Sequence, residues 1–411
     1  MSTPQVQVIP DGSITSTPGF EAAGAACGLK PNGALDLALV YSPQPCVGAA
    51  VFTTNAFKAA SVLYNRELLA RNATALHGVV INSGCANACT GERGLRDAEA
   101  TATSAASHLA QAPSGFLVMS TGVIGTLLPM DKIRAGVAQA ALQKAPSVDA
   151  GHAAARAIMT TDTRPKEVAV KVATATGEFT IAGMAKGAGM IHPNMATMLC
   201  LLTCDAPVTP QVAQQALREG VEGSFNRITV DGDTSTNDTV LLLANGLAEM
   251  QPITSATSSD YPAFLAGVSQ VLTTLAQAVV RDGEGATRFV EIITSGARTE
   301  AEAKQVAMSV ARSLLVKTAI YGQDANWGRI ICAVGYSGVA VEPERVRVWL
   351  GDLELFRNGE PYQIDEAHAR ELLARPEITI HIDLGQGDAQ ATVWTCDLSH
   401  KYVDINAHYR T

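Results

Sequence analysis

One segment near the middle of the chain combines residues that suit the attack of a side-chain hydroxyl on its own backbone. Residues 186–199 read Lys-Gly-Ala-Gly-Met-Ile-His-Pro-Asn-Met-Ala-Thr-Met-Leu. Two glycines and a proline bend the chain ahead of Thr197, which opens the apolar run 198–202. The hydroxyl of Thr197 can attack the carbonyl of Ala196, whose small side chain leaves room for a tetrahedral intermediate. These features favour an autocatalytic threonine nucleophile.

Breaking the bond before Thr197 would also create a base. The new α-amine has an unperturbed pKa of about 8, so it can take the proton of the hydroxyl on the same residue. A separate histidine–aspartate pair is then unnecessary, and we expect His192, the one histidine close to the segment, to be structural. By composition alone, an ordinary glycine-rich connection into a strand, with Thr197 a β-branched strand residue, is the favoured interpretation.

The surrounding sequence predicts strands and helices in alternation. The apolar runs 79–81 and 116–119 predict strands, each followed by a tight turn, at 82–84 and 120–122. The other signals are Asp131 as an N-cap, Pro210 at a first helical position, a helix over about 264–280, the capping box of Thr299 and Glu302, and the alternating strand 378–384. We therefore predict an α/β or α+β fold whose sheets are covered by helices.

Composition narrows the class of protein. The 411 residues predict two or three domains, and 47% hydrophobic residues supply a large core. A net charge of -9 argues against nucleic-acid or anionic-membrane partners. We find no apolar run of about 18 residues and no signal peptide at the start, so the expected compartment is the cytoplasm.

Several familiar sites are absent from the sequence. The eight cysteines are scattered and their two close pairs have no nearby histidine, so we expect neither a metal site nor a disulfide framework. No nucleotide-binding P-loop, G-x-S-x-G, H-E-x-x-H or strand-linked G-x-G-x-x-G occurs. P-loop ATPases, α/β-hydrolases, zinc proteases and Rossmann dehydrogenases are therefore disfavoured.

Ordered blocks along nearly the whole chain give a sharper indication. Together with 186–199 they resemble the ornithine acetyltransferase (bifunctional glutamate N-acetyltransferase) family. The other blocks are 82–84 with 86–91, 120–125 with 128–130, 159–163, 230–238, 282–287, 326–330 and 406–411. The departures are Cys85, where the family often has asparagine, and Ala325, where proline is common. Neither residue is assigned to chemistry.

The resemblance implies a self-processed enzyme. Cleavage between Ala196 and Thr197 would give an α chain, 1–196, and a β chain, 197–411, with a smaller C-terminal subdomain from about 285. Thr197 would attack the acetyl group of N2-acetyl-L-ornithine and pass it to L-glutamate. The Thr121 hydroxyl and the Gly122 N–H would form the oxyanion hole, which is consistent with fixed donors at a strand-end turn.

The resemblance also implies a set of substrate contacts. They are Thr160 (or Thr161), Lys186, Thr197, Glu284, Asn406 and Thr411. Lys186 suits a carboxylate and Glu284 an ammonium group. Family members need no metal or bound cofactor, and they differ in whether acetyl-CoA also serves as a donor.

The family fold stacks two sheets between helical layers. Its chemistry is like that of N-terminal-nucleophile hydrolases, although the topology is its own. The usual assembly is an α2β2 heterotetramer, a dimer of αβ heterodimers, acting on small molecules.

Two other functions remain open at this point. A self-processing aminopeptidase would use the same nucleophile on peptides, but the pair Lys186 and Glu284 favours a small amino-acid substrate. A non-catalytic amino-acid sensor would keep the fold without the reaction, but the presence of Thr197, Thr121 and Gly122 together argues against it. A purified chain without acetyl transfer or cleavage would favour the sensor.

Overall fold

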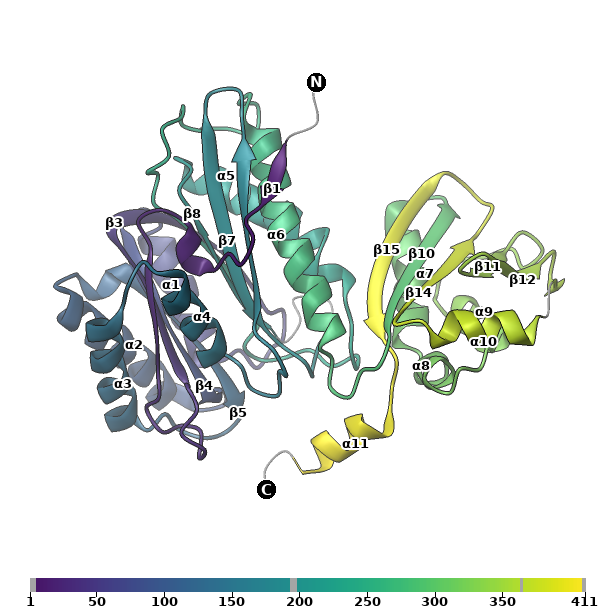
Figure 1. The fold of residues 1–411 in the computed structure, drawn as a ribbon, viewed down its shortest axis with the longest axis horizontal. Helices are drawn as coiled ribbons and strands as arrows, with labels where there is room; N and C mark the ends of the chain where they lie inside the picture. Colours follow the sequence, from purple (N-terminus) through teal and green to yellow (C-terminus); the bar gives the residue numbers. More distant parts are fainter. Residues whose placement is uncertain (1–4, 193–197, 363–364, 409–411) are drawn as a thin grey trace. The chain divides into compact units, whose positions relative to one another are not determined.

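The computed structural model describes residues 5–192, 198–362 and 365–408 (Figure 1). The chain forms two compact units. Unit 1 comprises Met1–Gly187, Asn194–Asn226 and Asp233–Val279, and unit 2 comprises Ala188–Pro193, Arg227–Gly232 and Val280–Thr411.

Unit 1 is built on nine strands. Their order is β1-β6-β7-β8-β9-β3-β4-β5, and β2 pairs with β3 off this path. The strands are β1 (Val6–Val8), β2 (Glu21–Ala25), β3 (Leu37–Phe52), β4 (Leu76–Cys85), β5 (Phe116–Val123), β6 (Lys166–Ala173), β7 (Glu178–Lys186), β8 (Leu199–Cys204) and β9 (Thr239–Ala244).

The long strand β3 divides these strands into two layers. Its first half pairs with β2 and β4, its second half pairs with β9, and the register shifts between Tyr41 and Cys46. The two layers face each other across one buried cluster. From one layer this cluster takes Ala38, Val40, Val79, Ile81, Leu117 and Met119, and from the other Met184, Leu199, Leu201, Leu241 and Leu243.

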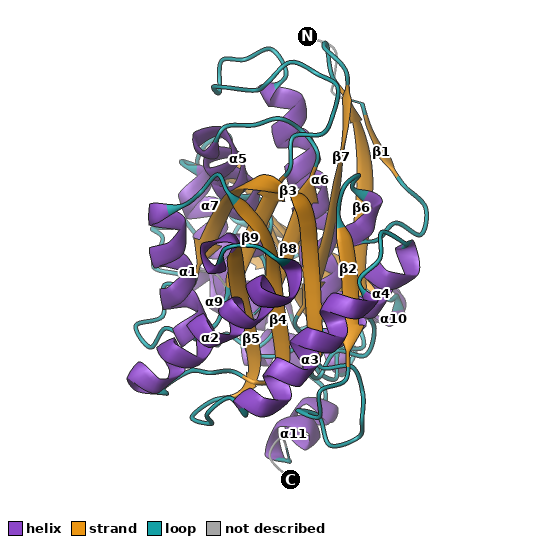
Figure 2. Ribbon diagram, turned by 90° about the vertical axis from the view of Figure 1, so that its left-hand side faces the viewer, coloured by secondary structure: helices purple, strands orange, loops and turns teal. Residues whose placement is uncertain are grey.

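Helices cover both outer faces of unit 1 (Figures 1 and 2). The helices are α1 (Ala60–Arg71), α2 (Gly91–Leu109), α3 (Met130–Gln143), α4 (Val148–Ala157), α5 (Pro210–Glu222) and α6 (Tyr261–Arg281), with 3₁₀ turns at Ile14–Ser16, Pro113–Gly115 and Phe225–Arg227. Helices α2 and α3 pack on the layer of β2–β5, and α6 packs on the layer of β6–β9. The expected pair of stacked sheets between helical layers is confirmed.

Helix α6 is long and apolar enough to cross a membrane by length and composition alone. Its packing is that of a core helix. Val271 and Leu275 lie against Gly183 of β7, where an added Cβ would come within 2.7 and 2.9 Å of them. The small residue on the strand therefore lets the helix approach the sheet closely.

Unit 2 has a six-stranded sheet of order β13-β12-β11-β14-β10-β15. Its strands are β10 (Phe289–Ala297), β11 (Arg347–Leu350), β12 (Leu353–Arg357), β13 (Glu360–Pro361), β14 (Glu377–Asp383) and β15 (Ala389–Cys396). Its helices are α7 (Glu300–Arg312), α8 (Leu314–Tyr321), α9 (Trp327–Gly335), α10 (Glu366–Ala374) and α11 (His400–Ala407). Thr299 caps α7 by accepting the Glu302 N–H, and burial alternates along β14, both as predicted.

Two local predictions were wrong. The predicted turns at 82–84 and 120–122 are strand, because the two triplets pair with each other in parallel as the ends of β4 and β5. Asp131 does not cap α3. The helix begins one residue earlier, where the Pro129 carbonyl accepts the Ile133 N–H at 3.1 Å, so Asp131 lies in the first turn.

Candidate active site

Thr121 and Gly122 lie where β5 ends. Thr121 is 6% exposed, and Gly122 has a φ of +131°. An added Cβ on Gly122 would lie 2.3 Å from the carbonyl carbon of Gly84 on the neighbouring strand. Both the backbone conformation and the close strand contact therefore require glycine at this position.

A side chain from a distant loop fixes this strand end. The Asn237 amide donates to the carbonyl of Ser120 at 2.7 Å and to the carbonyl of Ala86 at 2.6 Å. The Ser120 hydroxyl donates to Asn82 Oδ1 at 2.7 Å. Since all these groups are buried, the residues before Thr121 are held by a satisfied polar network.

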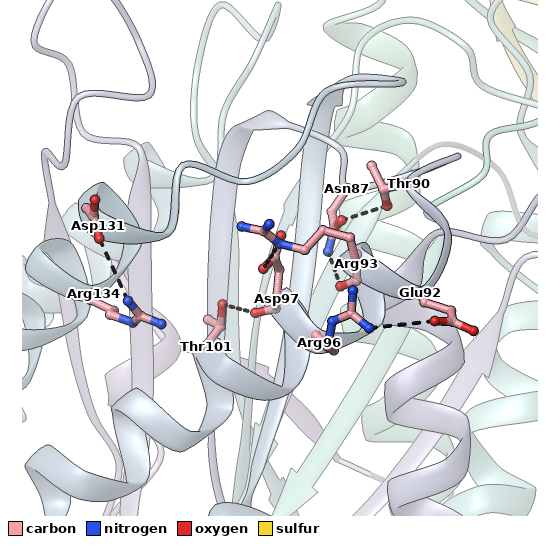
Figure 3. Close-up of polar contacts among 10 residues, drawn as sticks. Asn87, Thr90, Glu92, Arg93, Arg96, Asp97, Thr101, Asp131 and Arg134 are labelled. Atoms are coloured by element: carbon pink, nitrogen blue, oxygen red, sulfur yellow. Dashed lines mark hydrogen bonds and ion pairs between the residues drawn. The ribbon is translucent and has the colours of Figure 1, made fainter.

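Side-chain hydrogen bonds hold the loop that follows β4 to the start of α2 (Figure 3). The Asn87 amide donates to the Gly94 carbonyl at 3.0 Å, and the Thr90 hydroxyl donates to Asn87 Oδ1 at 2.9 Å. Within α2, Arg93 pairs with Asp97 at 2.9 Å. The same loop holds the end of β5, because the Ala86 N–H donates to the Val123 carbonyl at 3.0 Å.

Lys186 approaches Thr121 from the end of β7. Its side chain is buried, and Nζ donates to Thr121 Oγ1 at 3.5 Å. Lys186 also pairs in the ladder with Leu199, the first residue of β8. Two of the residues that the sequence predicted for the site are thus brought together, on strands far apart in the sequence.

Asp162 holds the backbone that follows Lys186. Its Oδ1 accepts the Gly187 N–H at 2.7 Å and the Lys166 ammonium at 2.6 Å, and its Oδ2 accepts the Thr160 N–H at 2.9 Å. Burial alone would raise the pKa of Asp162. The charges of Lys186 and Lys166 and these hydrogen bonds outweigh it and lower that pKa below its usual range. The carboxylate is therefore ionised at neutral pH.

Thr160 and Thr161 both lie in the loop between α4 and β6, and both are half-buried. The Thr160 N–H donates to Asp162 Oδ2 at 2.9 Å.

The proposed cleavage site, Ala196 and Thr197, lies outside the described residues, as does Thr411. The first described residue after them is Met198. Its N–H donates to Asp238 Oδ1 at 3.1 Å, and its carbonyl accepts the Thr239 N–H at 3.1 Å. The chain is therefore anchored directly after Thr197.

The remaining predicted ligands belong to unit 2. The Asn406 amide donates to Glu284 Oε2 at 2.7 Å, and the Glu284 N–H donates to the Ala188 carbonyl at 2.8 Å. A Cβ on Gly189 would lie 2.4 Å from the Glu284 carboxyl group. Gly189 is therefore needed for the close approach of this carboxylate to the 188–191 turn.

The Asp231 carboxylate holds the 188–191 turn through two backbone hydrogen bonds. Its two oxygens accept the N–H groups of Met190 at 2.6 Å and Ile191 at 2.9 Å.

Burial and the charge of Arg312 lower the pKa of His192 to about 4, so its ring is neutral at pH 7. His192 faces the Thr229 hydroxyl at 3.4 Å, which is consistent with the structural role expected of it.

Residue types alone did not single out Asp162, Asn237 or Asp238. All three lie inside sequence blocks that carry the family resemblance, 159–163 and 230–238. Block membership was thus the available signal, and it does not say which residue in a block contacts the site.

Comparison with known proteins agrees with the sequence resemblance. A model described as the ArgJ family matches residues 21–411. The "Arginine biosynthesis bifunctional protein ArgJ" of Symbiobacterium thermophilum is 50% identical over 403 residues, which cover 97% of this chain and 99% of that protein. The mitochondrial protein of the same name from Sordaria macrospora is 48% identical over 416 residues, covering 96% and 88%.

Among solved structures, the ornithine acetyltransferase of Mycobacterium tuberculosis complexed with ornithine is 41% identical. The match covers 46% of this chain and 98% of that chain, with a TM-score of 0.43. Because the family model and full-length relatives cover nearly every residue, the chain belongs to the ArgJ family. That membership favours acetyl transfer over the self-processing aminopeptidase.

Proposed function

We propose that this chain, an acyltransferase of the ArgJ family, transfers the acetyl group of N2-acetyl-L-ornithine to L-glutamate in arginine biosynthesis. The observation that carries the proposal is the strand-end arrangement in unit 1. There Thr121 and Gly122 are held by a buried network, and Lys186 Nζ contacts Thr121 at 3.5 Å. Lys186 is paired with Leu199, two residues after Thr197.

The proposed reaction begins with processing. The Thr197 hydroxyl attacks the Ala196 carbonyl, and the resulting ester is hydrolysed to an α chain of 1–196 and a β chain of 197–411. A smaller C-terminal subdomain begins at about 285 of the β chain. The new α-amine of Thr197 then serves as the base for its own hydroxyl.

Acetyl transfer follows in two steps. Thr197 Oγ attacks the acetyl carbonyl and gives its proton to the α-amine. The negative charge on the carbonyl oxygen is stabilised by the Thr121 hydroxyl and the Gly122 N–H. The α-ammonium returns the proton to the departing ornithine amine, which leaves acetyl-Thr197. The glutamate amine attacks this ester, and Thr197 recovers its hydroxyl.

Head-group recognition is proposed to rest on opposite charges. Lys186 binds the α-carboxylate of the substrate, and Asp162 positions it by holding the Gly187 N–H at 2.7 Å. Glu284 binds an ammonium group and is oriented by Asn406. Thr160 or Thr161 and Thr411 complete the set. Because ornithine and glutamate share the amino-acid head group, the same residues can bind each of them in turn.

The route above uses no metal and no bound cofactor, and acetyl-CoA is at most a second acetyl donor. We propose an α2β2 heterotetramer in the cytoplasm. The relative from Symbiobacterium thermophilum has no organelle in its name, whereas the Sordaria macrospora relative is named as mitochondrial.

A transfer assay with each acetyl donor tests the function. With N-acetylornithine and glutamate, we expect ping-pong kinetics with parallel double-reciprocal lines. With N-acetylornithine alone, mass spectrometry should find one acetyl group on a fragment that begins Thr-Met-Leu-Cys. Intersecting lines and an unmodified fragment would leave Thr197 a processing residue only. A parallel reaction with acetyl-CoA and glutamate shows whether the second donor is used.

A further inference from the structure

A hairpin loop of unit 1, residues 26–36 between β2 and β3, packs against the end of β4. An added Cβ on Gly84 would lie 3.2 Å from Leu29 Cβ in this loop. Gly84 is the residue that pairs with Gly122 across the parallel ladder of β4 and β5. The loop therefore lies against the strand end that carries the candidate oxyanion hole.

The buried carboxylate of Asp36 gives this loop a fixed shape. It accepts the N–H groups of Cys27 at 2.7 Å, Leu29 at 2.6 Å and Lys30 at 3.0 Å. Burial alone would raise the pKa of Asp36, but the hydrogen bonds outweigh it and lower that pKa. The Asp36 carbonyl also accepts the Ser83 N–H at 2.9 Å, so the loop is bound to β4. The backbone of Lys30 is thus held in place relative to the strand end.

The side chain of Lys30 is half-buried within the loop. Its Nζ donates to the Leu35 carbonyl at 2.7 Å. An ammonium group has three donors, and the Leu35 carbonyl takes one of them. The geometry therefore fixes the position of the amine while leaving it able to donate to a bound anion.

The charge of Lys30 belongs to the same cluster as the candidate carboxylate-binding residue Lys186. Burial lowers the pKa of Lys30, the carboxylates of Asp36 and Asp162 partly oppose this, and the charge of Lys186 lowers the pKa further. Charges interact appreciably within about 10 Å at ordinary ionic strength. Two neighbouring ammonium groups repel each other, so an anion bound near both would be favoured.

We infer that Lys30 is a specificity-determining residue that binds the side-chain carboxylate of the acceptor amino acid, while Lys186 binds its α-carboxylate. This inference rests on the proposed function and deepens it. Glutamate carries a second carboxylate, whereas the side chain of N2-acetyl-L-ornithine ends in an ammonium group. The Lys30 ammonium attracts the former and repels the latter, so it favours the acceptor in the second half of the reaction.

Ping-pong kinetics measure the two halves of the reaction separately. The kcat/KM for N-acetylornithine reports the acetylation of the enzyme, and the kcat/KM for glutamate reports the transfer to the acceptor. Lys30→Met keeps a long side chain but removes the charge. We expect its kcat/KM for glutamate to fall by about 10 to 10²-fold, mainly through a higher KM, because a charge-assisted contact is lost. Its kcat/KM for N-acetylornithine should not fall.

Glutamine as an alternative acceptor isolates the effect of charge. It has nearly the shape of glutamate but no side-chain charge. The wild type should prefer glutamate, Lys30→Arg should keep that preference, and Lys30→Met should lose it by the same factor of about 10 to 10²-fold. A purely structural role of Lys30 would instead weaken transfer to both acceptors equally.

Lys132→Met is the matched control. Lys132 of α3 is exposed, and its Nζ donates to the Gly28 carbonyl of the same loop at 2.6 Å. This variant also removes a lysine contact to the loop, yet it should keep both kcat/KM values and the preference for glutamate. Should Lys30→Met not fold, Lys30→Gln keeps a donor for the Leu35 carbonyl without the charge, and it should lose the same preference.

The outcomes separate this inference from the proposed function. If the wild-type chain transfers acetyl groups to neither acceptor, the proposed function fails. If the wild type is active but uses glutamine as well as glutamate, only the role of Lys30 fails. Equal falls in both kcat/KM values of Lys30→Met, or an unchanged preference for glutamate in Lys30→Met or Lys30→Gln, would also overturn the role of Lys30.

Discussion

In each unit, a parallel pair of strands ends at a glycine with positive φ, but different groups form the hydrogen bonds that hold the two strand ends. In unit 2, backbone hydrogen bonds hold the ends of β10 and β14 together. The Leu384 N–H donates to the Ser295 carbonyl at 3.0 Å, and the Gln386 N–H donates to the Gly296 carbonyl at 2.7 Å. In unit 1, the end of β4 and β5 also has such a backbone hydrogen bond, from the Ala86 N–H to the Val123 carbonyl at 3.0 Å, but the side chain of Asn237 holds it in addition.

The difference shows what makes a strand end suitable for chemistry. In both places glycine allows the positive φ that the backbone adopts, +131° at Gly122 and +67° at Gly296. In unit 1, however, side chains from separate segments meet at the end: Asn237 holds the strand, and Lys186 reaches Thr121. A parallel pair with a terminal glycine is therefore only a scaffold, and the polar side chains around it distinguish the candidate site.

Removing the proposed nucleophile, Thr197, is expected to have the largest effect on acetyl transfer. Thr197→Ala should stay a single uncleaved chain without detectable acetyl transfer, because the attacking hydroxyl is gone. Gel electrophoresis and N-terminal sequencing measure cleavage. Thr203→Ser, on β8 of the same unit, keeps its hydroxyl and should be cleaved and active. An intact Thr197→Ala chain with full activity would contradict the mechanism.

Gly122 and the turn glycine Gly385 of unit 2 should respond differently to an added methyl group. In Gly122→Ala, the new Cβ would lie 2.3 Å from the Gly84 carbonyl carbon, so the strand end must shift. We expect transfer to fall by on the order of 10³-fold. Gly385→Ala, at the turn after β14, has φ +61° and a nearest contact of 3.2 Å. It should lose about 1 kcal/mol of stability and retain activity; equal activity losses would break the comparison.

The two strand-end threonines give a finer test. Thr121→Ala should fold normally and lose on the order of 10²-fold in kcat, because one preorganised donor is missing. Thr294 lies in β10 with its hydroxyl buried and unpaired among the residues described. Thr294→Ala should therefore leave kcat unchanged. Near-wild-type kcat in Thr121→Ala would remove Thr121 from the oxyanion hole.

The smallest expected effect is a pH-dependent loss of folding stability when Asp162 is replaced. The pKa of Asp162 is lower in the folded chain than the unfolded value of about 3.9, so its ionised form stabilises the fold above that pH. This contribution is lost as pH falls below about 4 toward the lower folded pKa. Asp162→Asn should cost about 2 kcal/mol at pH 7 and less in acid, as measured by urea unfolding. A loss that does not change with pH would contradict the assignment.

Asp383→Asn, at the corresponding strand end of unit 2, is the control for that measurement. Asp383 Oδ1 accepts the Gly385 N–H at 3.0 Å, and asparagine can keep this hydrogen bond. We expect little change in the free energy of unfolding at either pH.

Local signals in the sequence were sufficient for isolated elements. Capping and periodicity predicted α7 and β14, because caps and alternation depend on residues close together in the chain. The ends of β4 and β5 were mistaken for turns, since Ser-Thr-Gly is turn-like locally and only pairing with a strand from elsewhere keeps it extended. Asn237 was missed for the same reason, because its contacts lie far away in the sequence. Asp162 also has local partners in Thr160 and Lys166, but the contact that places it beside Lys186 is with Gly187 and follows no spacing rule.

The strand order of unit 1 has a consequence for any cut before Thr197. Both β8 and β9 come after that bond, and they lie between β7 and β3, which come before it. Six residue pairs join β7 to β8, and six join β3 to β9. The two fragments would thus share one sheet, and neither could dissociate without opening two ladders at its centre. Fragments made separately would expose unpaired central strands, so any cut before Thr197 would have to follow the folding of the whole polypeptide.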